Sequence, residues 1–361
     1  MRFLLIGNPE NRRVSYFQRA CKNLGLENPL VLSWESLLQT PKILHEYINQ
    51  CDALRIDSTG ENYSVSKLLV EQCGSKYFSE KDYLNGRIGL SVEWYQGWLK
   101  ILKDIETALP THFPSMNCPS DLALCFDKFR CQTHLSEANI PTPKILGTIH
   151  AAKDVFDLME AYQSRRVFIK PAHSSSASGV IALEKSRDKI CATTSIKIDN
   201  SHLYNSLTMQ KYHTWEDITQ VIDILSEENL FVEQWVPKLT IQGRATDFRV
   251  LMIQGSPTHI VARTSKTPIT NLHLNNQRGD LNHIKKILGN NVWSRAMKTC
   301  QDVATLFPKS HYLAIDLAIG VHGNTIKVIE TNAFGDLLPN LLHNNIDTYE
   351  AELKSWLDLH T

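Results

Sequence analysis

Short apolar runs alternate with helical patterns along the first third of the chain. The run and the helix that follows it fall at 2–7 and 12–24, at 29–33 and 35–50, and at 52–57 and 64–73. Strands that take turns with helices are typical of a small parallel α/β unit. The pattern therefore predicts an N-terminal α/β domain over residues 1–114, ending in a proline-bearing stretch.

The middle of the chain changes character at a pair of prolines. A helical pattern over 120–138 ends before Pro141 and Pro143, which force the chain to extend. A strand, a helix at 151–163 and a further strand at 166–170 follow. The last of these strands runs into a loop of small residues, so we expect a second domain over 115–200.

The remainder, 201–361, is predicted to form a third domain. Thr214, with Asp217 three residues later, indicates a helix start. Further strands are predicted at 229–235, 247–254, 258–264, 312–320 and 325–331, and helices at 292–306 and 348–359. The second and third of these strands flank Gly255-Ser256-Pro257, which is a hairpin signal.

Composition narrows the classes of partner and compartment. The 361 residues are 42% apolar and 21% charged, and 38 basic side chains balance 38 acidic ones. This balance favours neither a nucleic-acid nor a membrane partner. Eight cysteines without a CxxC pair, and the lack of a signal-peptide or transmembrane pattern, predict a cytoplasmic protein.

Oxygen-bearing side chains interrupt the last two predicted strands. Asp316 lies within the apolar run 312–320, and Glu330 and Asn332 share one face of the next strand because side chains repeat every two residues. Two adjacent antiparallel strands would bring these oxygens together, and Mg²⁺ prefers such ligands. The alternative is that Asp316 caps a turn and Glu330 faces solvent.

Two lysines precede this triplet. Lys170 ends an apolar strand and is followed by a serine-rich loop whose hydroxyl and backbone N–H groups can cover phosphates. Lys128 lies on the helix that leads to the two prolines. Either lysine alone would be an ordinary surface residue, but their order relative to Asp316 and Glu330 favours phosphate binding.

Several short motifs appear in a fixed order over about 115–340. They are Asp127-Lys128, Ile140-Pro141-Thr142-Pro143, Ile169-Lys170-Pro171, Phe231 to Val236, Asp247-Phe248-Arg249 and Asn271-Leu272-His273. With the acidic triplet they resemble the ATP-grasp enzymes, closest in the C-terminal half to the RimK-type amino-acid ligases. The resemblance implies an α/β ATP-grasp fold with a Rossmann-like N-terminal preface domain and ATP held between two lobes.

The resemblance also implies a role for each matching residue. Lys128 and Lys170 would hold ATP phosphates, and Glu330 would bridge two Mg²⁺ ions, with Mn²⁺ as the alternative metal. The implied phosphate loop comprises Ser174, Ser175, Ser176, Ser178 and Gly179; the adenine hinge Glu233, Gln234, Trp235 and Val236; and the metal ligands Asp316, Glu330 and Asn332. No carboxylate occurs in 237–242, so no residue is assigned to the ribose.

The expected reaction is ATP-dependent ligation through an acyl phosphate. Arg249 is predicted to contact phosphate or the intermediate, and Arg263 to clamp a carboxylate or phosphate, because guanidinium binds either in a bidentate way. The alternative for Arg249 is an ion pair with Asp247. Expected substrates are an amino acid, peptide or protein bearing the carboxylate, with an amine or another nucleophile as co-substrate.

Other functions and sites stay open at this stage. A phosphotransferase acting on a hydroxyl, and a nucleotide-binding module without catalysis, are the alternatives to a ligase, and the chain is either a monomer or a homo-oligomer. Candidate substrate contacts in the first domain are Asn8, Arg12, Arg13, Asp57 and Thr59, at or just past predicted strand ends. The segments 7–13 and 332–339 resemble an uncharacterised bacterial ATP-grasp subfamily, which supplies no substrate.

Overall fold

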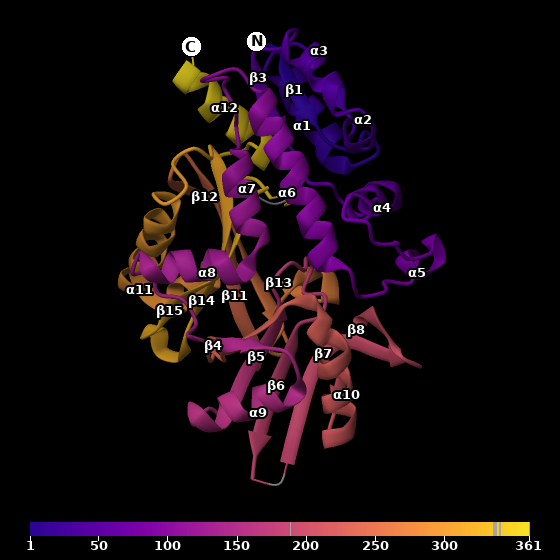
Figure 1. The fold of residues 1–361 in the computed structure, drawn as a ribbon. Helices are drawn as coiled ribbons and strands as arrows, with labels where there is room; N and C mark the ends of the chain where they lie inside the picture. Colours follow the sequence, from indigo (N-terminus) through magenta and orange to yellow (C-terminus); the bar gives the residue numbers. More distant parts are fainter. Residues whose placement is uncertain (188, 335–337, 339–340, 361) are drawn as a thin grey trace.

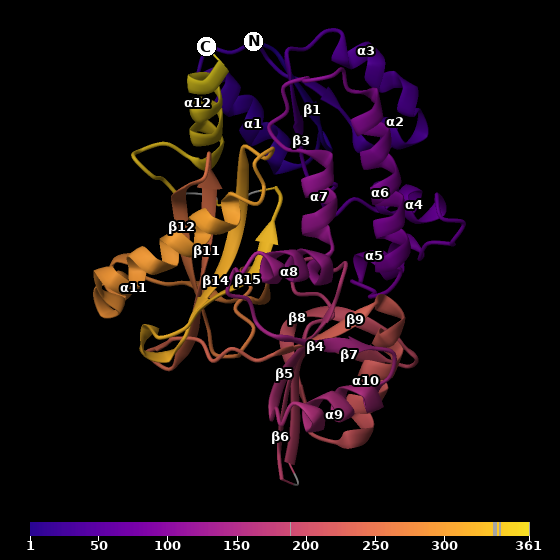
Figure 2. The same ribbon diagram turned by 60° about the vertical axis from the view of Figure 1, so that its left-hand side comes forward.

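Three β-sheets follow one another along the chain. The computed structural model describes residues 1–187, 189–334, 338 and 341–360. The first sheet belongs to an N-terminal domain, and the other two form a central and a C-terminal lobe. Figures 1 and 2 show the N-terminal domain and the central lobe at opposite ends of the molecule, with the C-terminal sheet beside both.

The N-terminal sheet is parallel, as predicted, with strand order β2-β1-β3. Its strands are β1 (Phe3–Ile6), β2 (Leu30–Leu32) and β3 (Ala53–Ile56). The accompanying helices are α1 (Arg12–Asn23), α2 (Trp34–Gln39), η1 (Pro41–Ile43), α3 (Leu44–Ile48), α4 (Tyr63–Glu71), α5 (Glu80–Leu84) and α6 (Ser91–Ala108). The prediction of one helix over 35–50 is wrong, because Pro41 lacks an N–H donor and the chain breaks at Thr40.

The predicted helix over 120–138 is also two helices, α7 (Pro119–Phe126) and α8 (Lys128–Glu137). Asp127 between them has an extended backbone, and its carboxylate caps α8 by accepting from the Arg130 N–H. Capping by Asp satisfies an N–H group that has no partner within the helix. The break places Lys128 at the first position of α8.

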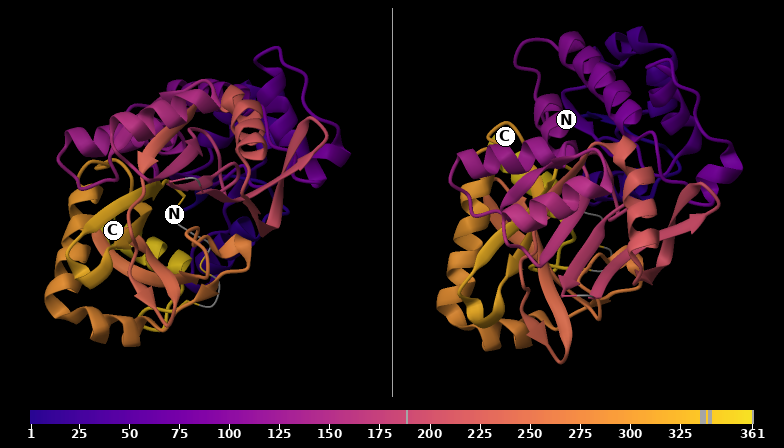
Figure 3. Two further views of the ribbon diagram at one scale, coloured as in Figure 1. Left: turned by 90° about the horizontal axis from the view of Figure 1, so that it is seen from below. Right: turned by 60° about the horizontal axis from the view of Figure 1, so that its bottom comes forward.

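The central sheet is antiparallel, with strand order β4-β9-β5-β6-β7-β8. Its strands are β4 (Ile145–Ile149), β5 (Arg166–Pro171), β6 (Ile181–Ser186), β7 (Lys189–Asp199), β8 (His202–Tyr212) and β9 (Leu230–Gln234). The helices α9 (Ala152–Ala161) and α10 (Trp215–Leu225) pack on the face that carries Val167 and Ile169. Side chains alternate along a strand, so Phe168 and Lys170 point to the opposite face of the sheet. Figure 3 shows the ribbon of the same lobes from two further directions.

The C-terminal sheet has the order β13-β12-β11-β14-β15, with β10 on the side of β11. Its strands are β10 (Thr240–Ile241), β11 (Arg244–Ile253), β12 (Ser256–Ser265), β13 (Gln277–Arg278), β14 (Tyr312–Ile319) and β15 (Ile326–Asn332). Helix α11 (Leu281–Ala304) packs against it. Its backbone is non-helical at Gly289, with φ 75° and ψ 159°, so the predicted helix at 292–306 corresponds to the part after this break, and Asp280 caps a separate first part. Three single turns, η2 (Ser226–Glu228), η3 (Leu272–Leu274) and η4 (Val321–Gly323), complete the lobes.

The last helix, α12 (Thr348–His360), packs against α1, so both chain ends lie at the same end of the molecule (Figure 1). The buried side chains of Arg55 and Glu352 form an ion pair of 2.7 Å between β3 and this helix. The expected boundary at residue 200 falls between the paired strands β7 and β8, so we propose that the central lobe extends to Gln234. No helix in the described part of the chain is long and apolar enough to cross a membrane.

Candidate active site

The register of β14 and β15 brings the three expected metal ligands close together on two neighbouring strands of the C-terminal sheet. Asp316 lies directly opposite Glu330, and Asn332 lies two residues further along the same strand, so the predicted antiparallel pairing is confirmed. The amide nitrogen of Asn332 is buried and has no hydrogen-bond partner among the described residues. Over the same residues no group of three or more His, Cys, Asp or Glu side chains could hold a metal. The candidate set is therefore two carboxylates and an amide.

Two arginines hold the Asp316 carboxylate. Arg249 Nε lies 2.6 Å from Oδ1 and Arg249 Nη2 2.8 Å from Oδ2, while Arg263 Nη1 lies 3.0 Å from Oδ2. Asp316 is only 4% exposed and lies in the middle of β14, so the alternative in which it caps a turn is wrong. A bidentate guanidinium fixes both oxygens of this carboxylate.

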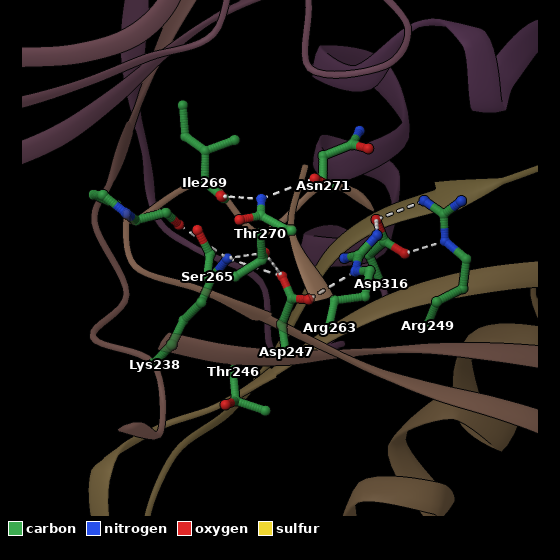
Figure 4. A network of polar contacts seen from close by, with 12 residues as sticks. Lys238, Thr246, Asp247, Arg249, Arg263, Ser265, Ile269, Thr270, Asn271 and Asp316 are labelled. Atoms are coloured by element: carbon green, nitrogen blue, oxygen red, sulfur yellow. Dashed lines mark hydrogen bonds and ion pairs between the residues drawn. The ribbon is translucent and has the colours of Figure 1, made fainter. Parts of the chain in front are cut away.

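Arg263 continues the network into the lobe (Figure 4). Its Nε donates to Asp247 Oδ1 at 2.8 Å, and Lys238 Nζ lies 2.8 Å from Asp247 Oδ2. Burial alone would raise the pKa of Asp247, but Arg263 and Lys238 outweigh it and hold that pKa well below its usual range. Asp247 thus stays ionised, and the pairing offered as an alternative for Arg249 is made by Arg263 and Lys238.

Lys128 connects the C-terminal lobe to the central lobe. Its Nζ lies 3.4 Å from Glu330 Oε1 and also donates to the backbone carbonyl of Ser174. The Lys128 backbone N–H donates to Ala172 O at 2.9 Å, which fixes the start of α8 against the serine-rich loop. One lysine therefore lies between a metal-type carboxylate and the expected phosphate loop.

Lys170 is nearly buried and forms an ion pair with Glu233. Glu233 is itself buried and accepts a second hydrogen bond from Gln132 Nε2 at 3.0 Å. Strands β5 and β9 are neighbours with Phe168 opposite Glu233, and this register brings the Glu233 and Lys170 side chains together. The Glu233 side chain thus orients Lys170, a role that the sequence did not suggest.

The serine-rich loop has a strained backbone. Ser176 and Ala177 have φ values of 54° and 60°, and Ser178 N donates to Ser175 O at 2.9 Å. Gly179 has φ 74°, and a Cβ there would lie 2.7 Å from Pro171 Cγ. Ser174 Oγ is buried without a partner among the described residues, so it can still donate to a ligand oxygen.

An apolar cluster joins the two lobes beside this loop. Phe168 and Ala182 of the central sheet pack with Ile269 and Leu274 of the C-terminal lobe, and Trp235 borders them. The Trp235 and Phe168 rings lie 4.9 Å apart. The backbone N–H groups of Gln234 and Trp235 donate to the carbonyls of residues 144 and 166. Within the predicted hinge, the Trp235 side chain borders the apolar cluster, and Val236 lies beyond the end of β9.

A family model described as YheC/D-like ATP-grasp matches residues 122–334, which is more than half of the chain. The chain belongs to the YheC/D-like ATP-grasp family. The match spans both lobes and all the residues expected to bind nucleotide and metal. It confirms the predicted superfamily and α/β fold, and with them the predicted enzyme class, an ATP-dependent ligase.

Solved structures share this ATP-grasp fold at low sequence identity. The D-cycloserine synthetase DcsG aligns over 100% of both chains with a TM-score of 0.60 and 12% identity. The D-alanine–D-alanine ligase of Bacillus anthracis complexed with ATP aligns over 99% of this chain and 96% of its own, with a TM-score of 0.55 and 14% identity. The ATP-grasp ligase PsnB, complexed with minimal precursor, Mg and ADP, aligns over 99% and 97% with a TM-score of 0.56 and 13% identity. No curated protein sequence matches the chain.

The N-terminal candidates of this ATP-grasp protein gather at the carboxyl edge of the parallel sheet. Asn8 donates to the carbonyl of Thr59, and Arg13 Nη1 lies 3.8 Å from Asp57 Oδ1. The same Arg13 nitrogen lies 3.4 Å from Phe334 O, just beyond Asn332. Arg12 opens α1 and is exposed. Residues 335–337 and 339 of the second subfamily motif lie outside the described residues.

Sequence reasoning missed four polar residues of this ATP-grasp site. Gln132 supports Glu233, and Lys238 and Thr270 bind Asp247. His173 stacks on Tyr95 of α6 with ring centroids 4.0 Å apart, so the N-terminal domain also contacts the serine-rich loop. The sequence carried one signal for Lys238: it stands just past the hinge, in the stretch where a carboxylate was expected.

Proposed function

We propose that the protein phosphorylates a substrate carboxylate with ATP and then joins the acyl phosphate to an amine. The observation that carries the proposal is the strand register that sets Asp316 opposite Glu330, with Arg249 and Arg263 on Asp316 and Lys128 beside Glu330. Cations from two lobes thus surround a pair of carboxylates. Such an arrangement suits phosphoryl transfer, in which positioning and charge stabilisation do most of the catalysis.

The oxygen donors fit magnesium. Asp316, Glu330 and Asn332 supply carboxylate and amide oxygens, which are the ligands that Mg²⁺ prefers. When bound, Mg²⁺ would neutralise phosphate charge as a Lewis acid. We propose that Glu330 serves two ions, with Mn²⁺ as the alternative metal.

The cationic side chains would exchange partners when ATP binds. Lys128 leaves the Ser174 carbonyl and Lys170 shares its Glu233 pair, so that both ammonium groups meet phosphate oxygens. The loop at Ser174, Ser175, Ser176, Ser178 and Gly179 then covers the phosphates with backbone N–H and hydroxyl groups. The adenine would lie against Trp235, beside the backbone of Gln234 and Val236.

The two arginines would act on the transferring group. A carboxylate oxygen of the substrate attacks the γ-phosphorus, the bond to the β-phosphate oxygen breaks, and ADP leaves. An amine then attacks the acyl carbon, loses a proton, and phosphate leaves as the amide forms. Arg249 and Arg263 stabilise the negative charge on the phosphoryl group and on the tetrahedral oxyanion.

The substrates we propose are an amino acid or a peptide. One solved relative in fold is described as complexed with a precursor peptide, and others are named as D-alanine–D-alanine ligase and D-cycloserine synthetase. All share only the fold with this chain. The carboxyl edge formed by Asn8, Arg13 and Asp57 lies beside the end of β15 and is the proposed place for substrate recognition.

The test is product analysis with a panel of substrates. The protein is incubated with ATP, Mg²⁺ and pairs of carboxylates and amines, and ADP, free phosphate and coupled product are measured. A ligase releases ADP and phosphate only when both substrates are present. Phosphate retained on a hydroxyl acceptor would instead identify a phosphotransferase, and absence of any turnover with bound ATP would identify a nucleotide-binding module.

A further inference from the structure

One segment of the C-terminal lobe reaches the central lobe. This connecting segment, residues 266–276, lies between β12 and β13. Its side chains Ile269 and Leu274 are buried against Phe168 and Ala182 of the central sheet. Phe168 and Lys170 are two residues apart on β5, so their side chains share one face. The connecting segment therefore packs on the face of β5 that carries the proposed phosphate-binding lysine.

A buried carboxylate anchors this segment to its own lobe. Asp247 Oδ2 accepts from the Thr270 hydroxyl and from Lys238 Nζ at 2.8 Å. Lys238 also donates to Pro268 O at 3.3 Å and to Thr270 Oγ1 at 2.8 Å. Asp247 is 1% exposed and Thr270 3% exposed, so solvent cannot replace these bonds.

The same carboxylate also reaches the metal-type site. Its other oxygen, Oδ1, accepts from Arg263 Nε, and Arg263 Nη1 lies 3.0 Å from Asp316 Oδ2. Figure 4 shows this continuous path from the connecting segment through Asp247 and Arg263 to Asp316. Opposite charges alternate along it in a buried setting, where each group depends strongly on its neighbours.

We infer that Lys238, Asp247 and Thr270 are positioning residues. They couple the packing of the connecting segment against a bound nucleotide to the orientation of the Asp316 carboxylate. The inference rests on the proposed function, because it assumes that nucleotide binds at Lys170 and metal at Asp316. Lys238, which stands after the hinge where a carboxylate was expected, thereby supports the Asp247 carboxylate. Nucleotide and metal binding are then linked through Arg263 by three side chains that touch neither ligand.

The experiment measures ADP binding by calorimetry over a range of Mg²⁺ concentrations. Thr270→Val keeps the shape of the side chain but removes the donor to Asp247. We expect ADP affinity to fall about tenfold, as for the loss of a hydrogen bond to a charged group, and the Mg²⁺ concentration for half-maximal binding to rise. Thr270→Ser should restore both values. Thr267→Val is the matched control, since the Thr267 hydroxyl bonds only to nearby residues 265 and 269 of the described chain.

The outcomes separate this inference from the proposed function. Thr270→Val with a lowered melting temperature but unchanged ADP affinity and Mg²⁺ dependence would overturn the inference and leave the proposed function standing. Wild-type protein that binds no ADP with Mg²⁺ would overturn both. If Thr270→Val does not fold, Lys238→Met removes the other donor to the same oxygen and should show the same two shifts.

Discussion

Glu330 is the residue whose surroundings best separate a ligand-binding role from a structural one. Its side chain is 29% exposed, and its ion pair among the described residues is with Lys128, at 3.4 Å. A partly exposed pair of this kind contributes at most about 1 kcal/mol to folding. Glu330 is therefore poorly explained as a stabilising residue.

We predict that Glu330→Ala abolishes ATP turnover and changes the free energy of unfolding by less than about 1 kcal/mol. Turnover is measured as ADP release with the best substrate pair, and stability by urea unfolding. Glu71→Ala is the control, because Glu71 forms a more exposed pair of 3.8 Å with Lys67 on α4, far from the site in sequence. Full turnover in Glu330→Ala would refute the metal-site assignment.

Lys170 differs from Glu330 because its partner is buried. Removing one member of a buried ion pair leaves an uncompensated charge and costs about 3–5 kcal/mol. We predict that Lys170→Met weakens ATP binding and lowers stability by this order, whereas Lys170→Met with Glu233→Gln recovers most of the stability and none of the ATP affinity. Equilibrium unfolding and nucleotide titration measure the two effects, and unchanged ATP affinity in either variant would contradict the proposed role of Lys170.

At the scale of elements, the serine-rich loop depends on one glycine. Gly179 has a left-handed backbone and lies too close to Pro171 to accept a Cβ. Gly255, in the β11–β12 turn, has a similar φ of 70°, and a Cβ added there would meet no other atom within 4 Å, so it is a matched control. Comparing the two alanine variants separates the effect of a changed loop shape from the backbone free-energy cost of placing alanine in a left-handed conformation.

We predict that Gly179→Ala weakens ATP binding several-fold beyond any effect of Gly255→Ala. Both variants bear about 1–2 kcal/mol of backbone cost, but only the first must also displace Pro171, which follows Lys170 directly. Nucleotide titration and thermal unfolding of both variants provide the measurement. Equal ATP affinity in the two variants would show that the loop does not contact nucleotide.

Element prediction succeeded where the pattern was strong and failed at local breaks. The strands around Asp316 and Glu330 were predicted to within two residues at each end, because long apolar runs mark buried strands. The helix expected over 120–138 is divided at Asp127, because a side-chain cap can begin a new helix without interrupting the apolar pattern. Strands β6, β7 and β8 were not predicted, since their polar faces blur the alternation.

At the scale of the molecule, a buried histidine links α12 to the C-terminal sheet. His311 Nε2 lies 2.9 Å from Glu352 O, and Nδ1 lies 2.7 Å from Gln254 Nε2. Burial lowers the pKa of His311 to about 4, and nearby Arg55 contributes in the same direction. The Gln254 amide donates to Nδ1, so a proton there would remove the acceptor.

This low pKa predicts a loss of stability in acid. The unfolded chain binds a proton near pH 6.5 and the folded protein only near pH 4, so the stabilisation is complete above pH 6.5 and is lost as the pH falls to about 4. The loss from His311 is about 3 kcal/mol. Urea unfolding between pH 7 and pH 4 should show a shallower decline for His311→Gln than for wild type. Parallel curves would mean that His311 does not control acid stability.

The sequence by itself determined the order of the lysines, the hinge and the acidic triplet, because each lies within or beside a strong local pattern. It therefore identified the ATP-grasp fold and provided the candidate residues for nucleotide and metal binding. Only the tertiary structure decided which charges meet: Arg249 and Arg263 on Asp316, Glu233 on Lys170, and Lys238 and Thr270 on Asp247. These pairs depend on strand register and on contacts between segments far apart in the chain, which no local pattern encodes.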